Sequence, residues 1–174
     1  MRRYLLFTPA LLLIAAATAF IFQQRPKQAG NRPPKADKIL VEKGARRLTL
    51  FSAGRKLKEY RLALGFSPTG PKEREGDGRT PEGIYTIDFH KPDSAFHRAL
   101  HVSYPSAEDN TRATEAGVSP GGEIMIHGLP NGLGALGAAD WSRDWTAGCI
   151  AVTDPEIDEI YSSVNDGTPI EILP

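Results

Sequence analysis

Apolar and polar residues alternate with a period of two along most of the chain from residue 38 onward. This alternation is typical of half-buried β-strands, because successive strand side chains point to opposite faces of a sheet. It predicts strands that contain Ile39 and Val41, Leu48 and Leu50, and Tyr60, Leu62 and Leu64. Five more segments have strand-like patterns, namely residues 84–87, 100–104, 123–126, 149–152 and 169–173.

One segment, residues 154–164, has helical spacing. Asp154 can cap its start, Pro155 suits its first position, and the Asn-Asp-Gly sequence that follows ends it. Its apolar positions recur three or four residues apart, at Ile157, Ile160, Tyr161 and Val164. Together with the strands, this helix predicts a mainly β sandwich or barrel with one packed helix.

The first part of the chain has a different pattern. Arg2 and Arg3 precede an apolar run, residues 4–22, whose length approaches the ~20 residues that span a bilayer. Residues 1–22 are therefore predicted to direct export, either as a signal peptide or as an N-terminal membrane anchor. Residues 23–37 contain three prolines and scattered charges, which is typical of an extended linker. Residues 38–174 remain as one domain.

Composition and motifs exclude several classes of function. The 21 acidic and 21 basic residues balance, so no electrostatic argument favours nucleic acid as a partner. Residues 132–137 spell G-x-G-x-x-G, but they lack the preceding strand and following helix of a dinucleotide site, so we interpret them as a flexible loop. The four histidines and the cysteine do not have the spacing of a metal site. We expect neither a metal nor a cofactor.

Two long loops, residues 65–83 and 128–148, interrupt the predicted strands. Loops of this length in a compact domain are usually functional or disordered. The second loop contains Trp141 and Trp145, which argue against disorder. These tryptophans either pin the loop to the core or line a substrate groove.

Cys149 is the only cysteine, and it lies in a Thr-Ala-Gly-Cys sequence at the start of a predicted strand. A single cysteine cannot form an intramolecular disulfide, so in an exported protein it is either an intermolecular partner or a free reactive group. If His127 reaches it, Cys149 is an activated nucleophile with a lowered pKa. The alternative is that Cys149 is a small buried hydrophobic residue, as most single cysteines are.

Three segments resemble, in order, the L,D-transpeptidase catalytic domain family (YkuD-type). They are residues 79–85 (Arg-Thr-Pro-Glu-Gly-Ile-Tyr), 126–128 (Ile-His-Gly) and 146–150 (Thr-Ala-Gly-Cys-Ile). The resemblance implies a β-sandwich of mixed sheets with one or two short packed helices. It also implies a cysteine that attacks peptidoglycan stem peptides.

Matched residue by residue, the resemblance implies that Cys149 is the nucleophile and His127 the base. Gly128 matches the position whose carbonyl orients the imidazole, with Asp144 as a second candidate for this role. The backbone N–H groups of Gly148 and Cys149 are the expected oxyanion donors. Thr146 and Gly148 match the small residues that precede the nucleophile.

The chain departs from the family pattern at Ala151, where many members have an arginine. A cation at this position would suit a substrate carboxylate. Arg143, Arg79 or Arg112 could supply the charge from loops, and we expect Arg143, Arg79, Thr146 and Trp145 to bind substrate.

The resemblance implies a cysteine acyltransferase that acts on peptidoglycan stem peptides through a thioester on Cys149, in the periplasm or outer cell envelope. Two alternatives remain open. The protein is an amidase or carboxypeptidase that gives the same thioester to water, or it is a catalytically silent envelope-binding module. A peptidoglycan-linked envelope protein is a possible further partner, and residues 4–22 would provide contact with the membrane.

Overall fold

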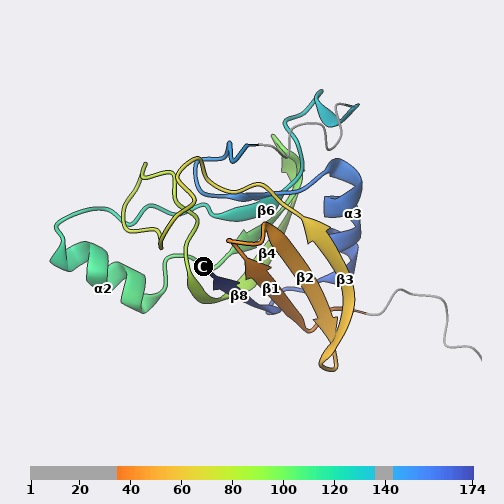
Figure 1. Ribbon diagram of the computed structural model, residues 1–174, viewed down its shortest axis with the longest axis horizontal. Helices are drawn as coiled ribbons and strands as arrows, with labels where there is room; N and C mark the ends of the chain where they lie inside the picture. The colour runs from red at the N-terminus through yellow and green to blue at the C-terminus, as the bar shows by residue number, and fades with distance from the viewer. Residues whose placement is uncertain (1–34, 136–142) are drawn as a thin grey trace, which may run out of the picture. The chain divides into compact units, whose positions relative to one another are not determined.

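The computed structural model describes residues 35–135 and 143–174. Its strands form an eight-stranded mixed sheet in the order β3-β2-β1-β8-β4-β5-β6-β7 (Figure 1). Their bounds are β1 Lys38–Glu42, β2 Arg47–Ser52, β3 Arg55–Arg61, β4 Gly83–Ser94, β5 His97–Val102, β6 Met125–His127, β7 Ile150–Ala151 and β8 Pro169–Leu173. The predicted mainly β fold with mixed pairing is confirmed.

The long strand β4 joins the two halves of the sheet. Its first four residues, Gly83 to Thr86, pair with β8, whereas the residues from Ile87 onward pair with β5. The sequence predicted only residues 84–87 as strand, because Pro92 and the polar residues around it interrupt the apolar alternation. Register shifts between Ile87 and Phe89 and between Lys91 and Ser94 show where the alternation breaks down.

β3 and β7 are the first and last strands in this order. The residues that directly follow β3 pair with β7 and so link the two ends of the sheet. Ala63 pairs with Ala151 of β7, and each residue donates its N–H to the other's carbonyl at 2.9 Å. Residues 62–64 are all buried. β7 therefore lies between β6 on one side and this segment on the other.

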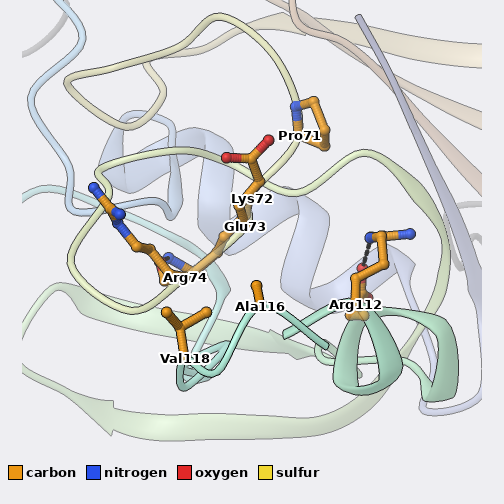
Figure 2. Close-up of a pocket in the computed structure, with 8 residues that line it drawn as sticks. Pro71, Lys72, Glu73, Arg74, Arg112, Ala116 and Val118 are labelled. Carbon is orange, nitrogen blue, oxygen red and sulfur yellow. Dashed lines mark hydrogen bonds and ion pairs between the residues drawn. The ribbon is translucent and has the colours of Figure 1, made fainter. Parts of the chain in front are cut away.

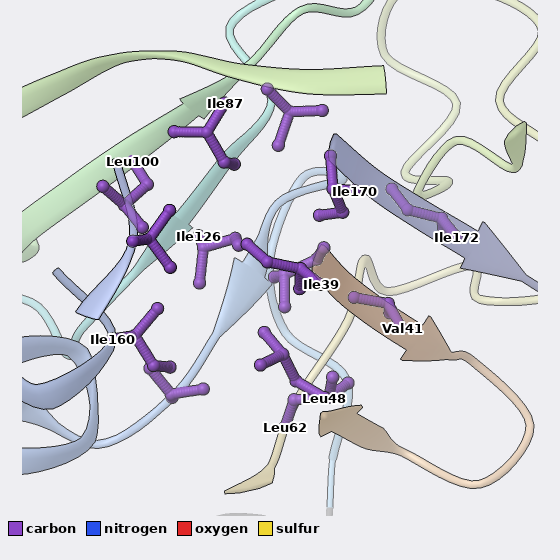
Figure 3. Close-up of a cluster of buried hydrophobic side chains, with 14 of the residues drawn as sticks. Ile39, Val41, Leu48, Leu62, Ile87, Leu100, Ile126, Ile160, Ile170 and Ile172 are labelled. Atoms are coloured by element: carbon purple, nitrogen blue, oxygen red, sulfur yellow. The ribbon is translucent and has the colours of Figure 1, made fainter. Parts of the chain in front are cut away.

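The core is built by strands whose apolar residues are in register. Ile39 of β1 pairs with Leu50 of β2 and Ile170 of β8, so the same face of three strands is apolar. One layer further on, Val41 pairs in the same way with Leu48 and Ile172, and all six side chains are buried. They form one cluster with Ile87, Leu100, Ile126 and Ile160, which come from β4, β5, β6 and a helix (Figure 3). Each such side chain contributes roughly 1.5–3 kcal/mol by leaving water.

The predicted helix is confirmed as α3 (Asp154–Ser163), which packs against β5 and β6. Its N-cap is Thr153 and not the predicted Asp154, because Thr153 forms a capping box with Glu156. Asp154 instead accepts a hydrogen bond from the Leu129 N–H at 2.8 Å.

A second helix, α2 (Ala107–Glu115), was not located from the sequence. It begins with a capping box between Ser106 and Asp109, but only Asp109 and Ala113 are buried along it. Because α2 has no apolar stripe, hydrophobic periodicity could not find it.

The predicted leader, residues 1–22, and most of the predicted linker lie outside the described residues. The end of the linker contacts the domain, since Ala36 is buried and its N–H donates to the Ser163 carbonyl at 2.8 Å. None of the helices in residues 35–135 and 143–174 is long and apolar enough to cross a membrane.

Lys43, directly after β1, ties the long 65–83 loop to the sheet. Its side chain is 2% exposed, and its Nζ donates to the Gly70 carbonyl (2.6 Å), the Thr80 carbonyl (2.9 Å) and Glu82 Oε1 (2.8 Å). The sequence pattern gave no sign of a buried lysine here. Three acceptors from one loop meet at a single ammonium group.

We predict that Lys43→Ala lowers the free energy of unfolding by about 3 kcal/mol, because it leaves the Glu82 carboxylate without its cation in a mostly buried site. Lys38→Ala is the matched control, since Lys38 pairs with Glu171 in a solvent-exposed position and should cost no more than about 1 kcal/mol. Urea denaturation of both variants measures the difference. Equal losses of unfolding free energy in the two variants would show that the Lys43 pair contributes no more than a solvent-exposed ion pair.

Candidate active site

The parallel pairing of β6 with β7 brings His127 and Cys149 together. His127 is opposite Ala151 in this pairing, and Ile126 is opposite Ile150. Cys149 precedes β7 and, by strand alternation, shares the face of Ala151 and hence of His127. Both side chains line one pocket of about 360 Å³.

The geometry around His127 defines its tautomer. Its Nδ1 lies 2.7 Å from the Gly128 carbonyl oxygen, which can only accept, so Nδ1 carries the proton and donates. Nε2 is then the unprotonated nitrogen. Burial lowers the pKa of His127 below its usual value, and the Gly128 carbonyl offsets part of this effect. His127 is therefore a neutral imidazole at pH 7, with a free lone pair on Nε2.

The thiol is also neutral in this structure. Burial raises the pKa of Cys149; the Met125 backbone N–H and Lys72 oppose this effect, and the charge of Glu123 adds to it. The Sγ atom donates to the Glu123 carbonyl at 3.5 Å, and among the described residues no hydrogen bond joins it to His127. The lowered pKa expected from the sequence is thus not found, because desolvation outweighs the nearby donors.

Thr146 shapes the turn before Cys149. Its buried hydroxyl donates to the Cys149 carbonyl at 2.7 Å and accepts the Gly148 N–H at 3.1 Å. The Gly148 N–H, one of the two expected oxyanion donors, is therefore already engaged. The Cys149 N–H has no hydrogen-bond partner in the described part of the chain, so it is the donor available to an oxyanion.

Only glycine fits at position 148. Its φ is +137°, and an added Cβ would lie 2.7 Å from the Arg79 carbonyl oxygen. Gly65 is equally constrained, because its Cβ would lie 2.1 Å from the Gly78 carbonyl oxygen and 3.0 Å from the Gly148 Cα. The 65–83 loop and the cysteine turn therefore pack backbone against backbone.

Aromatic rings surround the histidine. Phe96, in the turn between β4 and β5, lies with its ring centroid 4.5 Å from that of His127. Trp145 meets the His127 ring edge-on at 5.7 Å, and both Phe96 and Trp145 line the pocket. The two rings contribute to the burial of the imidazole, and burial lowers its pKa.

The predicted substrate-binding residues divide into two groups. Thr146 and Trp145 line the pocket, whereas Arg143 and Arg79 are not among its described lining residues. Arg143 is exposed, and Arg79 pairs with Glu73 at 3.1 Å.

Arg112 lines a different pocket, of about 390 Å³, between residues 71–74 and α2, where it pairs with Asp109 (Figure 2). Asp144 is held by Arg46, with 2.6 Å between Oδ2 and Nη2, and it accepts the Leu64 N–H at 2.9 Å. Since Nδ1 of His127 donates to the Gly128 carbonyl, that carbonyl, and not Asp144, orients the imidazole.

The other three histidines pair with separate carboxylates. His90 lies 2.5 Å from Asp166, His97 3.1 Å from Asp158, and His101 2.7 Å from Asp88. No group of three or more potential metal ligands occurs within the described ranges.

The sequence model of the L,D-transpeptidase catalytic domain matches residues 36–172. The chain belongs to this family. The resemblance seen in the three sequence segments is thereby confirmed, over nearly all of the described residues.

Individual relatives agree with this assignment. YafK of Escherichia coli K12, which carries the L,D-transpeptidase name, is 32% identical over 110 residues, or 62% of this chain and 37% of YafK. The helical cell shape determining protein Pgp2 of Campylobacter jejuni, crystallised as a point mutant, is 26% identical with a TM-score of 0.61 and covers 80% of this chain and 47% of Pgp2. An L,D-transpeptidase from Mycobacterium smegmatis shares the fold at 17% identity and a TM-score of 0.52, covering 80% of this chain and 59% of that one. This chain spans 37% of the length of YafK and about half of the length of Pgp2.

Several residues that line the pocket of this L,D-transpeptidase domain had no signal in the sequence, among them Lys91 and Phe96. Both come from the β4–β5 hairpin, 30 or more positions before His127, and no motif marks them. An aromatic residue directly before His97, at the tip of a hairpin, was the only available signal.

Because burial raises the pKa of Cys149, we predict that its alkylation by iodoacetamide accelerates with pH through an inflection above that of an ordinary cysteine. The thiolate is the reactive form, so a raised pKa moves the reactive window to higher pH. The chain unfolded in urea is the internal control, since Cys149 is its only thiol. An inflection below that of the unfolded chain would show that the pair rests as thiolate and imidazolium.

Proposed function

We propose that this protein is a cysteine acyltransferase that acts on peptidoglycan stem peptides through a thioester on Cys149. The observation that carries the proposal is the hydrogen bond from His127 Nδ1 to the Gly128 carbonyl. It leaves Nε2 as a base in the same pocket as the only thiol of the chain. Catalytic hydrogen bonds in unliganded enzymes are often long and tighten when substrate binds, so the neutral resting pair is compatible with this role.

The first half of the reaction forms the thioester. The Cys149 thiol proton moves to His127 Nε2 while Sγ attacks the carbonyl carbon of the scissile amide. The carbonyl oxygen becomes an oxyanion that accepts the Cys149 N–H, and the Gly128 carbonyl stabilises the transient imidazolium through Nδ1. The imidazolium then gives its proton to the leaving nitrogen as the carbon–nitrogen bond breaks.

The second half determines the class of enzyme. In the transferase, an amine of a second stem peptide attacks the thioester and passes its proton to Nε2, and the thiol is restored. In the amidase or carboxypeptidase, water takes the place of the amine.

One observation keeps hydrolysis as a second candidate. None of the described residues that line the pocket is an arginine, so an anionic peptide is held by fewer charges than the sequence led us to expect.

Incubation of the full-length protein with tetrapeptide muropeptides, with and without an added D-amino acid, distinguishes these outcomes. We expect an acyl adduct on Cys149 by intact mass, together with exchanged or cross-linked peptides. Shortened peptides alone would identify a hydrolase. Release of protein from protein-linked sacculi would identify an amidase that acts on an attached envelope protein.

The Cys149→Ala variant is the control, and it should form neither adduct nor product. Wild-type protein that forms no adduct but still binds muropeptides would be a catalytically silent binding module.

We further propose that residues 1–22 direct the domain to the periplasm or outer envelope, because Arg2 and Arg3 precede the long apolar run of residues 4–22. A reporter that fluoresces only in the cytoplasm, fused after Pro174, should therefore stay dark, and deletion of residues 1–22 should make it bright. A bright full-length fusion would contradict the proposal. The mass of the mature N-terminus separates a cleaved signal peptide from an anchor.

A further inference from the structure

We propose that Lys91 binds a substrate carboxylate in the Cys149 pocket. The inference rests on the proposed function, since it names the group of the stem peptide that the same pocket recognises. Lys91 lies on β4 opposite Ala99 of β5, and its side chain lines the pocket that holds Cys149 and His127.

Lys91 is the basic residue in the described lining of this pocket, and its ammonium group makes no hydrogen bond or ion pair with any described residue. Two other basic side chains near the site are paired: Lys72 donates to Asp77 at 2.9 Å, and Arg79 lies 3.1 Å from Glu73. Ala151, two residues after Cys149, is buried, pairs with Ala63 and supplies no charge.

The hairpin that carries Lys91 holds it in place. Lys91 pairs with Ala99, which in turn pairs with His127, so Lys91 and His127 share one face of the sheet. The register shift after Lys91 brings Ser94 to the same pocket, although strict alternation would place it on the opposite face. Asn131 braces the turn, because its Nδ2 donates to the Ser94 carbonyl at 3.0 Å and its Oδ1 accepts the His97 N–H at 2.8 Å. A braced turn lowers the entropic cost of ordering the lysine around a ligand.

The carboxylate of Glu123 is a second charge in the pocket. It favours a substrate group that carries an amine as well as a carboxylate. Glu123 also lines the pocket, yet it forms no ion pair with Lys91 among the described residues. A separate cation and carboxylate suit a substrate segment that carries both charges, as an amino acid with a free amine and a free carboxylate does. A lysine ammonium binds a carboxylate as a point charge with three rotatable donors.

A stem peptide offers two sources of such a carboxylate, its C-terminus and the side chain of its diamino acid. Binding is therefore measured with three synthetic tetrapeptides: one unmodified, one with a C-terminal carboxamide, and one with an amidated diamino acid side chain. The protein is the full-length Cys149→Ala variant, so that no turnover occurs during calorimetry. The peptide whose amidation weakens binding identifies the carboxylate that Lys91 contacts.

We expect Lys91→Gln to weaken binding of the unmodified peptide about tenfold or more, which is the range for a hydrogen bond to a charged group. The same substitution should leave one of the two amidated peptides unaffected. Lys91→Arg should restore most of the loss. Lys56→Gln is the matched control, because Lys56 lies on β3 and pairs with Glu59.

Equal loss for all three peptides, or no loss, would overturn the assignment of Lys91. These results differ from failure of the proposed function. Wild-type protein that binds the unmodified peptide through Lys91 but never forms an acyl adduct would contradict the acyltransferase proposal and leave the carboxylate site intact.

Discussion

The in-register parallel pairing of β6 and β7 is the constraint on which the candidate active site depends. β7 has only two residues, and it is held by β6 on one side and by Ala63 on the other. A slip of one residue would turn Cys149 to the face opposite His127. The apolar residues Ile126 and Ile150, buried beside each other, make such a slip costly. The core therefore sets the register, and the register sets the chemistry.

Burial explains the electrostatic state of the pair. The pKa of His127 is lowered and the pKa of Cys149 is raised for the same reason, which is that both charged forms lose water. A carbonyl at the third position suits this environment, because it fixes the tautomer without adding a buried charge. The same low dielectric strengthens the interaction of the Cys149 N–H with an oxyanion once it forms.

Sequence patterns predicted what depends on local periodicity or on short motifs. The alternation of Ile39 with Val41 located β1, helical spacing located α3, and the Thr-Ala-Gly-Cys sequence pointed to Cys149 as the candidate nucleophile. The rest depends on contacts between distant segments. Lys91 reaches the pocket because it pairs with Ala99, which pairs with His127, and Lys43 is buried because three acceptors of one loop surround it. Neither arrangement leaves a periodic signal in the sequence.

The distribution of charge around the pocket depends on the 65–83 loop and on the β4–β5 hairpin. Backbone contact among Gly65, Gly78 and Gly148 leaves no room for side chains where the loop meets the cysteine turn. Two basic residues of the loop are neutralised within it, as the pairs of Lys72 with Asp77 and of Arg79 with Glu73 show. The β4–β5 hairpin contributes a further basic residue, Lys91, to the described lining of the pocket. Strand pairing, and not the packing of the loop, sets the position of this lysine, because Lys91 pairs with Ala99, which pairs with His127. Close packing beside Cys149 and a cation on the hairpin therefore have separate causes.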